Sequence, residues 1–322
     1  MSSEDLTRGL LYLSLTVVGV PGNAAVVLAL LLLLHRRRRL LPPDAILLHL
    51  ACSNLLVVGV RCLLVTVASF GAEGIFGDAS CKAVVFTYRT FRAFSIWLTL
   101  VLSAYQCLSV APPGSRWLSV RAAAARYLGL VFLFLWVFNI CMSLESILFC
   151  VAKHNDSSQI GNGYNLQFCY LLFPSKLSKD VNTGAQVTRD AVPMALMTVT
   201  SVIILLFLYK NSQRVKGLRG GGTGTGGGGG AAEQRAAKSV VALVTLYVVF
   251  YGVDSGLTVY MLTVRRTMSS SLVTDLRVFF STLYAAVSPL LIIASNRKVS
   301  GSLRCAAHRK WAQERENDSF TT

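Results

Sequence analysis

Two arginines three residues apart, Arg89 and Arg92, stand in an otherwise apolar stretch and are the residues best suited to chemistry in this chain. Residues three apart share one face of a helix, so both guanidinium groups would lie on the same side. A guanidinium offers a planar fork of donors that matches a carboxylate. We therefore predict that at least one of the two binds an anionic or strongly polar ligand, unless internal acids neutralise both.

The stretch that carries this pair runs from 83 to 110 and can form a helix of about 42 Å at a rise of about 1.5 Å per residue. A bilayer core needs only about 20 residues, so the helix would span it with a tilt or an overhang. Arg89 would lie about 12 Å and Arg92 about 16 Å along the axis from Cys81. A charge at such depth is costly and by default indicates a functional site. The remaining members of the same helix stripe are Val85, Tyr88 and Ile96.

Two acids lie at comparable depth in other apolar runs. Asp254 falls about 13 Å below the end of its run, and Glu145 falls about 9 Å below the end of another. Each acid could therefore pair with Arg89 or Arg92, which is the structural alternative to ligand binding. Aromatic walls for a ligand, or simply a bundle core, would come from Tyr88, Tyr251, Phe280 and Tyr284.

Composition places these residues in a membrane protein. The 322 residues are 53% hydrophobic and only 14% charged, a balance typical of membrane spans. We predict an all-α membrane protein, a bundle of seven transmembrane helices over 9–295, with a short N-terminal segment 1–8 and a tail 296–322. The seven apolar runs are 9–34, 45–69, 83–110, 126–151, 188–209, 239–263 and 273–295.

The distribution of basic residues predicts the orientation. Of the 31 lysines and arginines, 19 fall in the segments 35–44, 111–126, 210–238 and 296–322. These are every second connection and the C-terminus, so the positive-inside rule predicts an extracellular N-terminus and a cytoplasmic C-terminus. The net charge of +16 is thus a topology signal and a contact for anionic membrane lipid, and it predicts no nucleic-acid partner.

Among the eight cysteines, only Cys81 and Cys169 are clearly extracellular in this topology, where disulfides persist. We predict that they pair and hold the long connection 152–187 over the bundle as a lid. The same connection contains Asn155 in an N-glycosylation sequence. Cys305 follows the last span on the cytoplasmic side and is a candidate for palmitoylation.

Local patterns give further expectations about packing. We expect an interhelical hydrogen bond between Asn23 and Asn54, and we expect the Arg61 side chain to extend toward the outer surface. The glycine-rich run 220–230 predicts a flexible coil. The segment after the last span predicts a short amphipathic helix at the membrane surface.

Four stretches resemble one receptor family: LPPDAILLHLACSN, RTFRAFSIWLTLVLSAYQCLSVAPPGSRW, PMALMTVTSVIILLFLYKNSQRVKGL and VSPLLIIASNRK. With the predicted layout, they are similar to the vomeronasal type-1 receptors, including the fish class-A-related olfactory receptors, which are G-protein-coupled receptors. The resemblance implies a chemosensory receptor at the plasma membrane. It implies a small semiochemical or amino-acid-derived ligand and an inhibitory-type heterotrimeric G protein as partners.

The chain departs from ordinary rhodopsin-like receptors at their conserved motifs. Tyr105-Gln106-Cys107 stands where those receptors have Asp-Arg-Tyr, Asn54 replaces their acid, and Ser288-Pro289 replaces Asn-Pro. The usual activation switch and sodium site therefore cannot be carried over. The residues expected to face the G protein are Tyr105, Gln106, Arg116, Arg214, Lys216 and Arg219.

Other classes of protein fit less well. A bitter-taste-type or other seven-span receptor is the closest alternative. A transporter built from two repeats would not have seven spans, and no internal repeat is visible. No nucleophile, zinc or phosphate-binding motif occurs, and the four histidines are scattered, so we predict no enzyme activity, no cofactor and no metal site.

Overall fold

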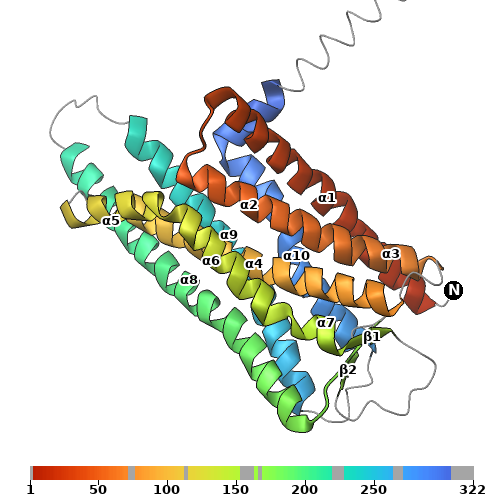
Figure 1. The fold of residues 1–322 in the computed structure, drawn as a ribbon. Coiled ribbons are helices and arrows are strands. Elements are labelled where there is room, and N and C mark those ends of the chain that lie inside the picture. Colours follow the sequence, from red (N-terminus) through yellow and green to blue (C-terminus); the bar gives the residue numbers. More distant parts are fainter. Residues whose placement is uncertain are drawn as a thin grey trace, which may run out of the picture.

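A computed structural model describes residues 3–71, 77–111, 115–152, 163–165, 169–219, 228–263 and 271–305. Within them, seven helices are long and apolar enough to cross a membrane, and they lie side by side in one bundle (Figure 1). This confirms the seven predicted spans. The expected Asn155 glycosylation site and residues 220–227 of the glycine run lie outside the described residues.

The helices follow the chain in order, and two of the spans are built from consecutive pieces. The second span joins α2, η1 and α3, the fourth joins α6 and α7, and the short α5 connects the third and fourth. Their bounds are α1 Ser3–Arg37, α2 Pro42–Val57, η1 Val58–Leu63, α3 Leu64–Ser69, α4 Asp78–Val110, α5 Ser115–Arg126, α6 Leu128–Ser143, α7 Glu145–Phe149, α8 Lys176–Arg219, α9 Gly228–Thr263 and α10 Ser271–Ser295.

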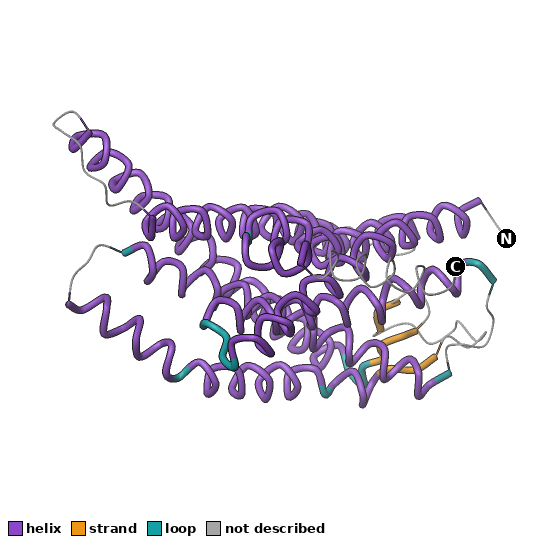
Figure 2. The backbone as a smooth tube through the Cα atoms, turned by 90° about the horizontal axis from the view of Figure 1, so that it is seen from above, coloured by secondary structure: helices purple, strands orange, loops and turns teal. Residues whose placement is uncertain are grey.

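A small antiparallel sheet is the exception to the helical architecture. It consists of β1 Cys150–Ala152, β2 Gly163–Asn165 and β3 Cys169–Leu172, in the order β1-β3-β2. Ala152 lies opposite Cys169 in the register of β1 and β3. Both views place the strands at the end of the bundle where the chain begins (Figures 1 and 2). We call this the disulfide end and the opposite one, where α5 lies, the basic end.

The core runs along the centre of the bundle, and α4 is the helix that contacts most of the others. Its buried side chains include Phe94, Ile96, Leu98 and Leu102. By contrast, α6 and α8 carry large exposed apolar residues such as Leu133, Phe134 and Leu206. In a bilayer those side chains would contact lipid, because hydrocarbon requires no polar surface.

Two packing expectations are wrong. Asn23 does not bond Asn54, because its Nδ2 atom donates to the backbone carbonyls of Gly19 and Ala285. Arg61 does not extend to a surface, since it is only 5% exposed and its guanidinium carbon lies 5.4 Å from the centre of the Tyr88 ring. Arg61 is in the π-helical turn η1, and such a turn changes the face that a helix presents to the bundle.

Two helix boundaries also differ from expectation. The fifth span begins at Lys176, twelve residues before the expected start at 188. The sixth helix begins at Gly228, so Gly228–Gly230 form a helical turn and not the expected coil. In both cases a polar or glycine-rich extension continues the helix beyond the apolar run that made the span visible in the sequence.

The chain continues as a helix after α10. Residues 297–305 are helical, as expected for the tail, and Val299 is fully buried. Lys298 Nζ lies 2.9 Å from Oδ2 of Asp44 in the first turn of α2. This ion pair joins the start of the tail to the basic end of the bundle, where Cys305 is exposed.

Candidate functional site

Arg92 occupies the centre of a cluster of charged side chains inside the bundle. Its Nη1 atom lies 2.5 Å from Oδ2 of Asp190 on α8, and its Nη2 atom lies 2.9 Å from Oδ2 of Asp254 on α9. Asp254 was an expected partner, whereas Asp190 was not. One guanidinium of α4 thus connects two neighbouring helices through two carboxylates.

Arg89 makes a second ion pair toward the fourth span. It contacts Glu145 at the start of α7, the other acid expected to reach it. Gln186 of α8 holds that acid in place, since its Nε2 donates to Glu145 Oε1 at 2.8 Å and to the Met142 carbonyl at 2.9 Å. The structure therefore contains the pairings that the structural alternative to ligand binding requires.

Two further arginines complete the cluster. Arg189 Nε lies 3.3 Å from Asp190 Oδ1, and Arg277 Nε of α10 lies 3.4 Å from Asp254 Oδ1. The Arg189 side chain is buried, but that of Arg277 is 38% exposed. The cluster of described residues thus holds four arginines, Arg89, Arg92, Arg189 and Arg277, against the three carboxylates Glu145, Asp190 and Asp254.

The surplus positive charge is physically significant because all of these groups except Arg277 are largely removed from water. Coulomb interactions grow as the local dielectric falls, so each arginine favours a nearby anion more strongly than it would at a surface. The desolvation of an unbalanced cation is also costly. One additional negative charge would balance the cluster.

Aromatic side chains of α9 support the guanidinium of Arg92. Its central carbon lies 4.5 Å from the centre of the Tyr251 ring, a cation–π distance. Tyr251 stacks on Tyr247 with ring centres 4.1 Å apart, and Tyr247 meets Tyr284 edge to face at 5.1 Å. The Tyr284 hydroxyl lies 3.0 Å from Thr99 Oγ1. Tyr251 and Tyr284 were both expected near the site.

Two buried donors near Arg92 have no acceptor among the described residues: its own Nε atom and the hydroxyl of Tyr247. Tyr247 is fully buried. Buried polar groups in proteins are almost always hydrogen-bonded, so unsatisfied donors indicate a place for a water molecule or a ligand acceptor. A ligand oxygen is the kind of group that could satisfy them.

The remaining expected site residues are not all at the cluster. Tyr88 lies between Arg61 and Ser281, whose Oγ is 2.7 Å from the Tyr88 hydroxyl. Ile96 is fully buried in the central core, and the Phe280 ring meets that of Phe279 edge to face. The structure therefore brings together Arg89, Arg92, Glu145, Tyr251 and Asp254, with Tyr88 close enough to interact electrostatically with Arg92 and Tyr251 and Tyr284 one ring further down.

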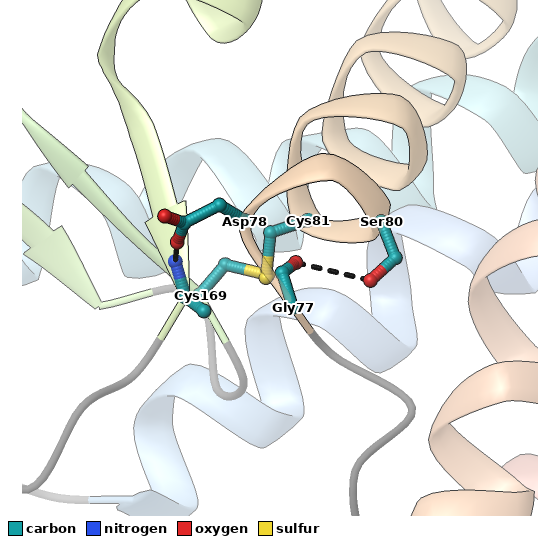
Figure 3. The surroundings of a disulfide bond; sticks show 6 residues. Gly77, Asp78, Ser80, Cys81 and Cys169 are labelled. Atoms are coloured by element: carbon teal, nitrogen blue, oxygen red, sulfur yellow. Dashed lines mark hydrogen bonds between the residues drawn. A yellow bond between two sulfur atoms is a disulfide. The ribbon is translucent and has the colours of Figure 1, made fainter.

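The disulfide forms between Cys81 and Cys169, as predicted. It joins the first turn of α4 to β3, and Asp78 of that turn accepts a hydrogen bond from the backbone N–H of Ala152 at 2.7 Å (Figure 3). Both contacts attach the sheet to the first turn of α4, about two helical turns before Arg89. The sheet therefore has a fixed position at the disulfide end.

At the basic end, α4 carries two of the residues expected to face a G protein. Tyr105 and Gln106 are both buried, at 9% and 6% exposure. Arg116 belongs to the first turn of α5, and Arg214, Lys216 and Arg219 belong to the last turns of α8. Among the described residues no group of histidine, cysteine and acidic side chains could hold a metal ion.

Together, seven apolar helices, a disulfide from the third span to the connection after the fourth, and a charged cluster inside the bundle define a membrane receptor of the seven-helix class. Residues 7–305 match the family described as "Vomeronasal organ pheromone receptor family". This chain belongs to that family. Its members are multi-pass G-protein-coupled receptors of the plasma membrane. Such receptors are not a class of enzymes.

Individual relatives cover almost the whole chain. "Olfactory receptor class A-like protein 1" of Danio rerio is 36% identical over 315 residues, 97% of each chain. "Vomeronasal type-1 receptor 4" of Homo sapiens is 26% identical over 301 residues, 93% of this chain and 97% of its own. "Vomeronasal type-1 receptor 1" of Gorilla gorilla gorilla is 25% identical over 300 residues, 93% of this chain and 83% of its own.

Sequence reasoning missed Asp190, Arg189, Gln186 and Arg277. Gln186 lies in the part of α8 that was expected to be a loop, and Arg189 and Asp190 lie in the first turn of the span expected from 188. Their signal was present, because charged residues directly before a long apolar run can still belong to its helix. Arg277 lies in the second turn of α10, where an arginine is easily taken for a surface residue.

Proposed function

We propose that this receptor detects a small anionic semiochemical at the arginine cluster and activates a heterotrimeric G protein at its basic end. In this proposal the disulfide end faces the outside of the cell and the C-terminus lies in the cytoplasm. The distribution of basic residues supports the orientation. Family membership supports a ligand and a G protein in general.

The observation that carries the anionic ligand is the excess of one arginine over the carboxylates of the cluster. A carboxylate or comparable anion would balance that charge in a region of low dielectric. Its oxygen atoms would also provide acceptors for the buried donors of Arg92 and Tyr247. A neutral ligand could do the second but not the first.

The aromatic rings around Arg92 favour a ligand with an apolar or aromatic body. Ligand sites in proteins are mostly apolar walls with a few polar groups that fix the orientation. Tyr251, Tyr247 and Tyr284 form such a wall beside the guanidinium. Glu145 and Arg89 would border the site on the side of α7.

The G protein would bind at the basic end. Arg116, Arg214, Lys216 and Arg219 lie on α5 and α8 there, and Tyr105 and Gln106 would become accessible when the helices separate. We propose an inhibitory-type Gα. Pertussis toxin should then abolish ligand-evoked inhibition of cyclic AMP formation in cells without an added Gα.

A screen of matched compounds tests the ligand class. Cells that express the receptor with a promiscuous Gα would be exposed to small organic acids, to the primary amide of each acid and to amines of similar shape, with intracellular calcium as the readout. We expect agonists among the acids, with the matched amide at least about 10-fold weaker, which corresponds to about 1.4 kcal/mol. Agonists found only among amides or amines would contradict the proposal.

A further inference from the structure

Asp254 lies between two arginines that belong to different helices. Its Oδ2 atom is 2.9 Å from Arg92 Nη2 on α4, and its Oδ1 atom is 3.4 Å from Arg277 Nε on α10. The contact with Arg92 is the shorter one and is the more buried. Arg92 in turn has a second carboxylate, Asp190 on α8, at 2.5 Å.

The Arg92 and Asp254 side chains can be paired with each other or apart, and in both states each retains an oppositely charged partner. If Arg92 released Asp254, the acid would keep Arg277 and the arginine would keep Asp190. Breaking a buried ion pair is strongly destabilising when it leaves one partner uncompensated. Here neither partner is left alone, so the exchange of partners is much less costly than the loss of an isolated pair.

We propose that the Arg92–Asp254 ion pair is the activation switch of this receptor. In the resting state it holds α9 against α4. A ligand anion that binds the Arg92 guanidinium displaces the Asp254 carboxylate, which keeps its contact with Arg277 and allows α9 to move away from α4. The inference rests on the proposed anionic ligand for its trigger, but not for the resting contact itself.

Contacts along α9 connect Asp254 with the basic end of the bundle. Asp254 and Tyr251 are three residues apart and both touch Arg92, and Tyr247 follows one turn further on. Below it, Val244, Leu243 and Val240 are buried in the central core, and Ser239 Oγ lies 2.5 Å from Ser295 Oγ of α10. Asp254 and Ser239 are about 22 Å apart along the axis at the usual rise per residue.

No proline interrupts this part of α9, so a displacement at Asp254 can reach Ser239 through one continuous helix. A two-state element that both ends bias is what long-range coupling requires. The ligand shifts the equilibrium only by the difference in its affinity for the two states. An anion meets that condition, since Arg92 can bind it fully only after releasing Asp254.

The switch predicts signalling without ligand when the pair is broken. The variant Asp254→Asn keeps the size of the side chain and removes its charge. Its control is Asp275→Asn, which removes the carboxylate that pairs with Arg8 at the same end of the bundle but outside the cluster. We expect basal inositol phosphate formation, in cells with a promiscuous Gα, to rise several-fold for Asp254→Asn and to stay at the wild-type level for Asp275→Asn, each normalised to surface expression.

Arg92→Gln provides the same test from the other side of the pair. It should also raise basal signalling, and it decides the matter if Asp254→Asn does not reach the surface. Wild-type basal signalling in a variant that reaches the surface would overturn the switch, and so would an equal rise in Asp275→Asn. So would failure of both variants to reach the surface, because the second partners of each group would then be insufficient.

These outcomes separate the switch from the proposed ligand class, because basal signalling needs no ligand. A rise in Asp254→Asn together with a wild-type receptor that responds only to amines would uphold the switch and refute the anionic ligand. A receptor that responds to acids, but whose variants show no rise in basal signalling, would uphold the anionic ligand and refute the switch.

Discussion

Asn54 and Ser288 lie 234 residues apart in the chain, yet Asn54 Nδ2 donates a hydrogen bond to Ser288 Oγ at 3.0 Å in the middle of the bundle. Asn54 Oδ1 accepts a second one from Ser95 at 2.6 Å. One buried amide thus joins α2, α4 and α10. In rhodopsin-like receptors the position corresponding to Asn54 is an acid, so here a neutral network connects the same helices.

This network predicts a cost for removing the amide. Asn54→Ala should lower the stability of the detergent-solubilised receptor by about 1–2 kcal/mol, because Ser95 and Ser288 lose their partner. Asn139→Ala is the matched control. Asn139 is equally buried, but within the described part of the chain its Nδ2 bonds the Leu135 carbonyl of its own helix. Equal shifts of the thermal midpoint in the two variants would show that the interhelical bonds contribute nothing.

Because of the disulfide, we expect replacement of Cys81 or Cys169 to impair the receptor and replacement of Cys150 to leave it unaffected. Cys81→Ser and Cys169→Ser should each abolish surface delivery or response, and the double variant should be no worse than either. Closing a loop of 88 residues is worth about 4–5 kcal/mol in the chain-entropy description. Cys150→Ala is the control, since Cys150 is buried in the same cluster but unpaired. Normal delivery of either serine variant would be incompatible with this function of the disulfide.

In the connection between α8 and α9, we expect the glycine-rich residues to be dispensable and the basic side chains at the end of α8 to be needed for G-protein coupling. Removing residues 221–227 should leave signalling nearly intact, because five of these seven residues are glycine, which offers no side chain for recognition, and loop closure depends only weakly on length. Replacing Arg214, Lys216 and Arg219 with alanine should weaken G-protein coupling. The measurement is agonist-evoked signal at equal surface expression. Loss of signal on the deletion with unaltered delivery would refute this assignment.

Much of the architecture followed from apolar runs and the placement of cysteines. A span needs about 20 apolar residues, so α1, α4 and α10 were visible in the sequence. The disulfide followed from topology, because only Cys81 and Cys169 were clearly on one side. Depth along the helix axis allowed Arg89 and Arg92 to pair with Glu145 and Asp254. It did not decide between these pairs and ligand binding.

The features that were not predicted depend on the rotation of each helix about its axis and on polar residues at helix ends. Depth says nothing about which helix faces which, so Asn23 was assigned to Asn54 when its acceptor is the Ala285 carbonyl. The π-helical turn at Arg61 has no clear sequence signal, yet it directs that side chain inward. Asp190 lay in the first turn of the predicted span 188–209, but depth and composition did not show that its side chain faces Arg92.

Removing Arg92 outright tests whether the cluster depends on it for folding. Asp190 and Asp254 keep Arg189 and Arg277 as partners, so Arg92→Ala should reach the surface while losing its ligand-evoked response. The measurement is surface labelling of the variant alone and combined with Asp254→Asn. Poor delivery of the single variant, with delivery and response both recovered in the double variant, would mean that Arg92 only balances the acid.

The potency of an acidic agonist on Arg92→Lys tests the central claim most directly. Lysine keeps the charge but loses the planar fork. At equal surface expression, its half-maximal concentration should rise about 10-fold or more, while that of Arg8→Lys should not change. Arg8 pairs with Asp275 at the same end of the bundle but outside the cluster. An unchanged half-maximal concentration for Arg92→Lys would contradict recognition of the ligand by the Arg92 guanidinium.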